Sequence, residues 1–89
     1  MTTIRVMRRN LGTNKETIVS GYSHIPISLA IKFLDHEAEA EAKQSKLTIR
    51  DDDVEDNGKM IYRRYLVEEH GGRGKDVVLF YLKCVQTKD

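Results

Sequence analysis

Two segments near the start of the chain have the alternating pattern of a β-hairpin. Residues 2–9 alternate apolar and polar side chains, with Ile4 and Val6 on one predicted face. Residues 10–15 are rich in Asn and Gly, which tolerate the positive φ angles of tight turns. Residues 16–22 are therefore predicted to form the returning strand, although few of them are apolar.

The next segment has the three- and four-residue spacing of an amphipathic helix. Pro26 suits the first turn of a helix, because its ring fixes φ and it has no N–H group to leave unpaired. Glutamates then alternate with alanines, and both residue types are strong helix formers. A helix is therefore predicted over residues 26–44. Its packing stripe, widened by Phe33, is predicted to be Ile27, Ala30, Ile31, Leu34, Ala38 and Ala42.

The dipeptide Asn57-Gly58 predicts a two-residue type I′ hairpin turn, because both residues tolerate positive φ. This turn sets Asp52 opposite Arg63 and Asp51 opposite Arg64. Cross-strand pairs of opposite charge contribute about 0.2 to 1 kcal/mol each, and a shift by one residue would turn every side chain to the wrong face. The register gives the acidic run a structural role, which argues against a calcium site.

The last predicted strand, residues 77–85, is apolar on both faces. A glycine-rich segment, residues 70–75, precedes it and is predicted to be a flexible loop between antiparallel strands. A strand that is apolar on both sides is normally covered twice, so we place it at the centre of the sheet, next to residues 60–67. The helix covers one face, and the other is predicted to need a loop, a second copy or a partner protein. The two faces are Val77, Leu79, Tyr81 and Val85 against Val78, Phe80, Leu82 and Cys84.

These elements predict a single α+β domain over residues 1–89. The expected fold is a mostly antiparallel sheet of four to five strands with one helix packed on one face, in ββαβββ order and roughly grasp-like. At 89 residues a deep catalytic cleft is not expected. No apolar run approaches the roughly 18 residues of a membrane helix, and no signal pattern is present. The single cysteine, Cys84, is predicted to be a small core residue, and the default location is the cytoplasm.

Charge is segregated along the chain, although the net charge is only +1. Residues 35–57 contain nine acidic and three basic residues, a net charge of −6, so the remainder carries +7. The folded molecule is therefore expected to present an acidic and a basic region, either as solvated and paired charges or as a surface that attracts a partner.

No catalytic, cofactor or metal motif is found in the sequence. The histidines His24, His36 and His70 are scattered without ligand spacing. The glycines and cations of residues 71–75 are similar to a phosphate-binding loop, but the P-loop spacing and the following helix are absent. We therefore expect no cofactor, no metal and no enzymatic activity.

Two binding functions remain from the residues alone. The leading hypothesis is a non-catalytic module that binds another protein or a second copy of itself, as an inhibitor, adaptor or accessory factor. In style the chain is similar to small phage and mobile-element proteins, although no residue carries that association. The alternative is single-stranded RNA or DNA binding on a basic and aromatic sheet surface. The candidate binding residues are Arg8, Arg9, Tyr62, Arg63, Arg64, Tyr65, Arg73 and Lys75.

Overall fold

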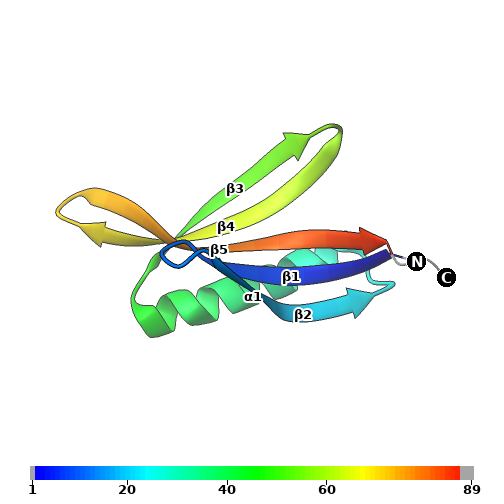
Figure 1. The fold of residues 1–89 in the computed structure, drawn as a ribbon, viewed down its shortest axis with the longest axis horizontal. Coiled ribbons are helices and arrows are strands. Elements are labelled where there is room, and N and C mark those ends of the chain that lie inside the picture. Colours follow the sequence, from blue (N-terminus) through cyan, green and yellow to red (C-terminus); the bar gives the residue numbers. More distant parts are fainter. Residues whose placement is uncertain (1, 87–89) are drawn as a thin grey trace.

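The computed structural model describes residues 2–86, and its element order confirms the predicted ββαβββ pattern (Figure 1). No helix within these residues combines the length and the hydrophobicity needed to cross a lipid bilayer. The elements are β1 (Thr2–Asn10), β2 (Lys15–Ser23), α1 (Ile27–Ser45), β3 (Thr48–Asp56), β4 (Lys59–His70) and β5 (Arg73–Gln86).

The strands form one antiparallel sheet in the order β2-β1-β5-β4-β3. β5 lies at the centre, as predicted, because it pairs with β1 on one side and with β4 on the other. The predicted hairpin register is also confirmed, with Asp52 opposite Arg63 and Asp51 opposite Arg64. The local turn chemistry therefore determines the pairing of β3 and β4.

The turn at Asn57-Gly58 gives a first testable result. Gly58 has a φ of 78°, where a side chain strains the backbone, so Gly58→Ala is expected to lower the free energy of unfolding by about 1 kcal/mol. No atom lies within 4 Å of a Cβ added there, so the cost comes from the backbone. Gly21→Ala in β2 is the matched control, because an added Cβ would make only an ordinary contact with Arg5. Urea unfolding measures both variants, and equal losses would contradict this explanation.

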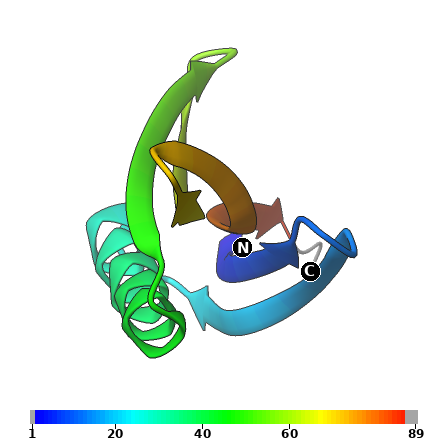
Figure 2. The same cartoon turned by 90° about the vertical axis from the view of Figure 1, so that its left-hand side faces the viewer.

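The core lies between α1 and the sheet (Figures 1 and 2). The helix packs against β1, β3, β4 and β5. Leu34 is fully buried and shares the core with Phe80, as predicted, and with Leu66 and Val6. The buried helical residues recur every four positions: Ala30, Leu34, Ala38 and Ala42. Their small side chains allow the helix to lie close to the sheet.

The ends of the helix differ from the prediction in one respect. Pro26 is the N-cap and Lys46 is the C-cap; the backbone of Lys46 is left-handed, and its N–H donates to the carbonyl of Ala42. Ile27 was predicted in the packing stripe, and this is wrong, because its side chain is 43% exposed. As the first helical residue, it lies where the chain enters the helix rather than over the core.

The far face of the sheet is partly shielded by the chain's own side chains, and its cover by a second copy or a partner protein stays a prediction. Met7 and Val67, on this face, are buried although no helix covers them. The guanidinium of Arg50 lies 4.4 Å from the ring centroid of Tyr65, and that of Arg63 lies 5.9 Å from it. Long arginine side chains thus shield apolar strand surface. The side chain of Val85, also assigned to this face, lies outside the described residues.

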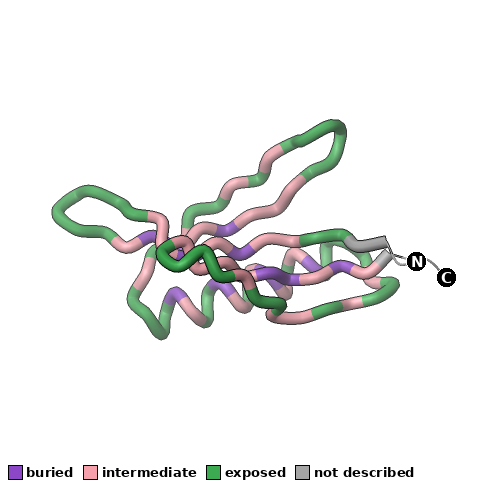
Figure 3. The backbone as a smooth tube through the Cα atoms, in the orientation of Figure 1, coloured by how far each residue is buried: buried purple, intermediate pink, exposed green. Residues whose placement is uncertain are grey.

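The segment predicted as a flexible loop is instead a tight turn. Only Gly71 and Gly72 connect β4 to β5, and both have positive φ, which lets two residues reverse the chain. Arg73 and Lys75 therefore belong to β5. The prediction that this segment connects two antiparallel strands is confirmed. The tips of the β3–β4 and β4–β5 hairpins are exposed, and the buried residues lie mainly where the strands meet α1 (Figure 3).

Candidate functional site

The sheet divides at one end, and this division creates the cleft that we consider as the functional site. β4 and β5 are paired from His70 and Arg73 as far as Arg63 and Tyr81. Beyond that point residues 59–62 pair only with β3, and residues 82–86 pair only with β1. The β3–β4 hairpin rises away from β5 and β1 (Figure 1). We call the space between them the split-sheet cleft; its volume is about 570 Å³, within the range of ligand-binding sites.

The floor and one side of the split-sheet cleft are apolar. Met60 and Tyr62 come from β4, Leu82 comes from β5, and Ile27 comes from the start of α1. Among the described residues, four large apolar side chains are exposed, and Ile27 and Met60 are two of them. The cleft therefore concentrates hydrophobic surface that the core does not use.

The opposite side of the cleft is mainly polar, apart from Ile61 of β4, and carries more positive than negative charge. Arg9 donates to Glu16 at 2.5 Å, and this hydrogen bond lowers the pKa of Glu16. Burial, together with the neighbouring Glu16 carboxylate, raises the pKa of the Tyr81 phenol to about 12, so it stays protonated at neutral pH. Lys59 and Lys83 complete this side, and both are exposed. Neither lysine has a carboxylate within 4.0 Å in the part of the chain that the structure describes.

Cys84 also lines the split-sheet cleft, which corrects its predicted place in the core. The thiol is free and exposed. Its strand is central in the sheet, but β4 has already separated from β5 before Cys84 is reached. An exposed thiol in the cleft wall provides a natural position for chemical labelling.

The structure does not gather the candidate binding residues on one surface. Arg8, Tyr62 and Arg64 lie on the helix side of the sheet, in register with or beside Phe80. Three others lie on the far side: Arg9, Arg63 and Tyr65. The remaining two, Arg73 and Lys75, lie in the β4–β5 hairpin. Only Arg9 and Tyr62 line the split-sheet cleft.

Most of the candidate arginines are neutralised within the molecule. Arg8 contacts Glu41 on the helix at 2.7 Å, and the hydrogen bond to Glu41 raises the pKa of Arg8. Arg63 contacts Asp52 at 2.7 Å, the pair predicted from the hairpin register. An arginine that is already held by a carboxylate has less positive potential to offer a phosphate group.

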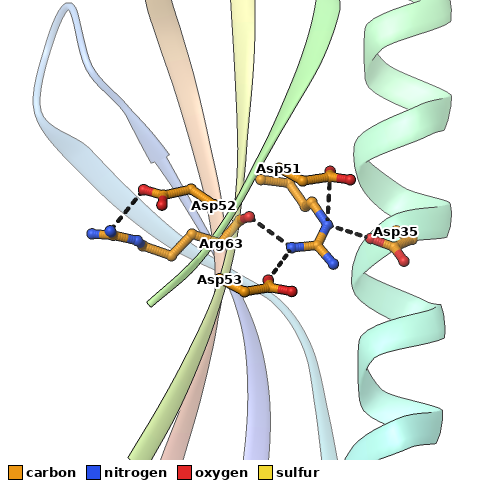
Figure 4. A network of polar contacts seen from close by, with 6 residues as sticks. Asp35, Asp51, Asp52, Asp53 and Arg63 are labelled. Carbon is orange, nitrogen blue, oxygen red and sulfur yellow. Dashed lines mark hydrogen bonds and ion pairs between the residues drawn. The ribbon is translucent and has the colours of Figure 1, made fainter. Parts of the chain in front are cut away.

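Arg64 is a structural residue at the point where the sheet divides. Its side chain is 8% exposed, and its Nε lies 2.7 Å from Asp35 of α1 and 3.0 Å from Asp51 of β3. Its Nη1 lies 2.7 Å from Asp53. Figure 4 shows Asp35 of α1 and Asp51 and Asp53 of β3 around one guanidinium group, that of Arg64. Arg63 points away from this group toward Asp52. The guanidinium thus ties the β3–β4 hairpin to α1.

The split-sheet cleft offers a ligand apolar surface, ammonium groups and a thiol. Within residues 2–86, no three side chains of the metal-binding types are grouped as a metal site requires. No protein-family model matches this chain, and neither the curated proteins nor the solved structures contain a match to it.

Of the residues on the apolar side of the cleft, sequence reasoning identified only Tyr62 as a candidate. Met60 and Ile27 were assigned to a strand and to the helix stripe, and both assignments are compatible with burial. One signal was present: Met60, Ile61 and Tyr62 form an apolar run beside the turn, farthest from the helix core. Such a run at a hairpin tip has no obvious cover within the chain.

Proposed function

We propose that this chain is a non-catalytic protein-binding module that acts as an inhibitor, adaptor or accessory factor on a larger partner. The observation that carries the proposal is the split-sheet cleft, which is lined by exposed Met60 and Ile27 and by exposed Lys59 and Lys83. An apolar centre with a charged rim is the usual composition of a protein interface. The exposed thiol of Cys84 supports a cytoplasmic location, because reducing conditions preserve a free thiol.

Substitutions in the cleft test the proposal. Met60→Asp places a charge in the apolar centre and is expected to weaken partner binding at least tenfold, as loss of an interface hot spot does. Ile18→Asp is the matched control, because Ile18 is exposed on the edge strand β2 and does not line the cleft. The immobilised protein and both variants are compared for recovery of host proteins, with thermal unfolding as a check on the fold. A partner retained by Met60→Asp but lost by Ile18→Asp would place binding elsewhere.

Single-stranded nucleic-acid binding has less support. The candidate residues are divided between two faces, and Arg8, Arg9, Arg63 and Arg64 each contact a carboxylate. Fluorescence anisotropy with a labelled oligothymidine separates the alternatives. Tight binding that falls steeply with salt would favour nucleic acid over the protein-binding proposal.

A further inference from the structure

We propose that the split-sheet cleft takes an extended segment of a partner protein, with alternating acidic and apolar residues, which adds as a strand to the free edge of β5. This inference rests on the proposed function and specifies its partner. It follows from four observations. Within the described residues, strand edges in the cleft are unpaired, the outer edges of the sheet are charged or irregular, the cleft carries lysines without a nearby carboxylate, and its two sides carry different side chains, apolar on one and basic on the other.

The first observation is the pair of strand edges that face the cleft. Residues 82–86 keep their ladder with β1, but β4 has left the other side of β5. Residues 59–62 keep only β3. Backbone N–H and C=O groups directed into the cleft along these edges therefore lack a strand partner. An extended peptide satisfies such groups by adding a strand.

The outer edges of the sheet are less suited to receive a strand. β3 carries five acidic side chains, Asp51, Asp52, Asp53, Glu55 and Asp56, and charged edges resist pairing. β2 has an irregularity in its pairing with β1 between Val6 and Met7, which disturbs a regular ladder. Neither feature is present in residues 82–86, where the register with β1 is continuous.

The charge in the cleft determines which strand fits. Arg9 and Glu16 neutralise each other, whereas Lys59 and Lys83 have no carboxylate within 4.0 Å among residues 2–86. Edge lysines repel a basic strand and disfavour an apolar one. An acidic strand gives both ammonium groups a partner, so the same lysines select for it.

The two walls of the cleft predict an alternating pattern in the segment. Lys59 and Lys83 extend from the face that carries Arg63 and Tyr81, because they are separated from these residues by even steps along their strands. Met60, Tyr62 and Leu82 extend from the opposite, helix-facing side. A strand between these walls therefore places acidic residues toward the lysines and apolar residues toward Met60. The free edge of β5 over residues 82–86 accommodates about five paired residues of such a strand.

A second copy of this chain does not match the pattern. The acidic strand at the edge of its sheet is β3, whose outer side has no neighbouring strand among residues 2–86. It has three consecutive aspartates, Asp51 to Asp53, so carboxylates point to both faces. Entry of β3 would place at least one of them against the apolar wall. The observations therefore favour a foreign segment.

Synthetic peptides test the proposal directly. The probe is a capped heptapeptide of alternating valine and glutamate; one control replaces glutamate by lysine, and another carries N-methyl groups on alternate residues. We expect the acidic peptide to shift the backbone amide signals of residues 59–62 and 82–86 and to slow alkylation of Cys84 by iodoacetamide at least tenfold. Both control peptides are expected to bind at least tenfold weaker, because one repels the lysines and the other has lost the N–H donors of its methylated residues along one strand edge.

A charge exchange makes the test specific. The double variant Lys59→Glu/Lys83→Glu is expected to reverse the preference, so that the lysine peptide binds more tightly than the acidic one. Lys75→Glu, in the β4–β5 hairpin outside the cleft, is the matched control and is expected to keep the original preference. Equal binding of the acidic and N-methylated peptides, shifts confined to β2 or β3, or loss of the shifts on competition with oligothymidine would overturn strand addition.

The outcomes also separate this inference from the proposed function. If Met60→Asp abolishes recovery of the partner but the acidic peptide leaves residues 82–86 unshifted, the binding function stands and strand addition is rejected. If the peptide binds at β5 but Met60→Asp leaves partner recovery unchanged, the split-sheet cleft is rejected as the site that binds the recovered partner. Amide shifts in the cleft that depend on protein concentration without peptide would identify a second copy as the occupant and overturn the inference.

Discussion

Replacing Leu34 by alanine is expected to lower the free energy of unfolding by about 2 to 5 kcal/mol, the range for fully buried leucines. Leu34 is the largest side chain that α1 contributes to the fully buried core, and the helical residues buried beside it are alanines. The neighbouring alanines cannot fill the space that Leu34 leaves. The cavity would therefore remain between α1 and Phe80.

Leu29→Ala is the matched control for this prediction. Leu29 lies on the same helix, but its side chain is 38% exposed, so its truncation is expected to cost far less. Urea unfolding followed by circular dichroism measures both variants. A near-neutral Leu34→Ala would mean that the helix does not pack on the sheet as described.

Arg64→Ala is expected to lower the free energy of unfolding by about 3 kcal/mol, the lower end of the cost of breaking a buried ion pair. Removal of the guanidinium leaves Asp35, Asp51 and Asp53 close together without a cation, so the helix and β3 repel each other. The partial exposure of these carboxylates keeps the cost from being larger, because water screens their repulsion.

Two further variants show whether geometry or charge alone matters at this position. Arg64→Lys keeps the positive charge, but an ammonium group cannot donate in two directions from one plane. The loss in free energy of unfolding is therefore expected to lie between zero and that of Arg64→Ala. Arg50→Ala removes an exposed pair with Asp76 and the contact of Arg50 with the Tyr65 ring, and is expected to cost about 1 kcal/mol. If Arg64→Ala costs no more than Arg50→Ala, the network does not hold the hairpin to the helix.

The Arg64 network also bears on the cleft. β4 leaves β5 at Arg63, and the next residue is held by carboxylates from α1 and β3. This anchor fixes the base of the β3–β4 hairpin, so the opening of the split-sheet cleft depends on it. Amide shifts of residues 59–62 and 82–86 in Arg64→Lys are a direct measure of that dependence.

Sequence and structure agree best where the determining interactions are local. The Asn57-Gly58 turn fixes the partners of β4 on β3, and the pairs Asp52–Arg63 and Asp51–Arg64 follow by counting from the turn. The helix was predicted over residues 26–44 and is found at Ile27–Ser45, because its apolar spacing is contained in one continuous segment.

The candidate site was only partly predicted. Arg9 and Tyr62 were selected for their charge and aromatic character, and both line the cleft. The hairpin register predicted the pair of Arg64 with Asp51, but not its contact with Asp35, because that contact joins residues that are distant in the chain. Cys84 was assigned to the core because its strand is apolar, whereas separation of the neighbouring strand exposes it.

The sequence by itself determined the order of the elements, the register of the β3–β4 hairpin and the central place of β5, because periodicity, turn chemistry and apolar content act within short segments. Only the tertiary structure decided where β4 parts from β5, which carboxylates hold each arginine, and which apolar side chains remain exposed. These features depend on the packing of α1 against several strands at once, and no local pattern specifies how far two paired strands stay together.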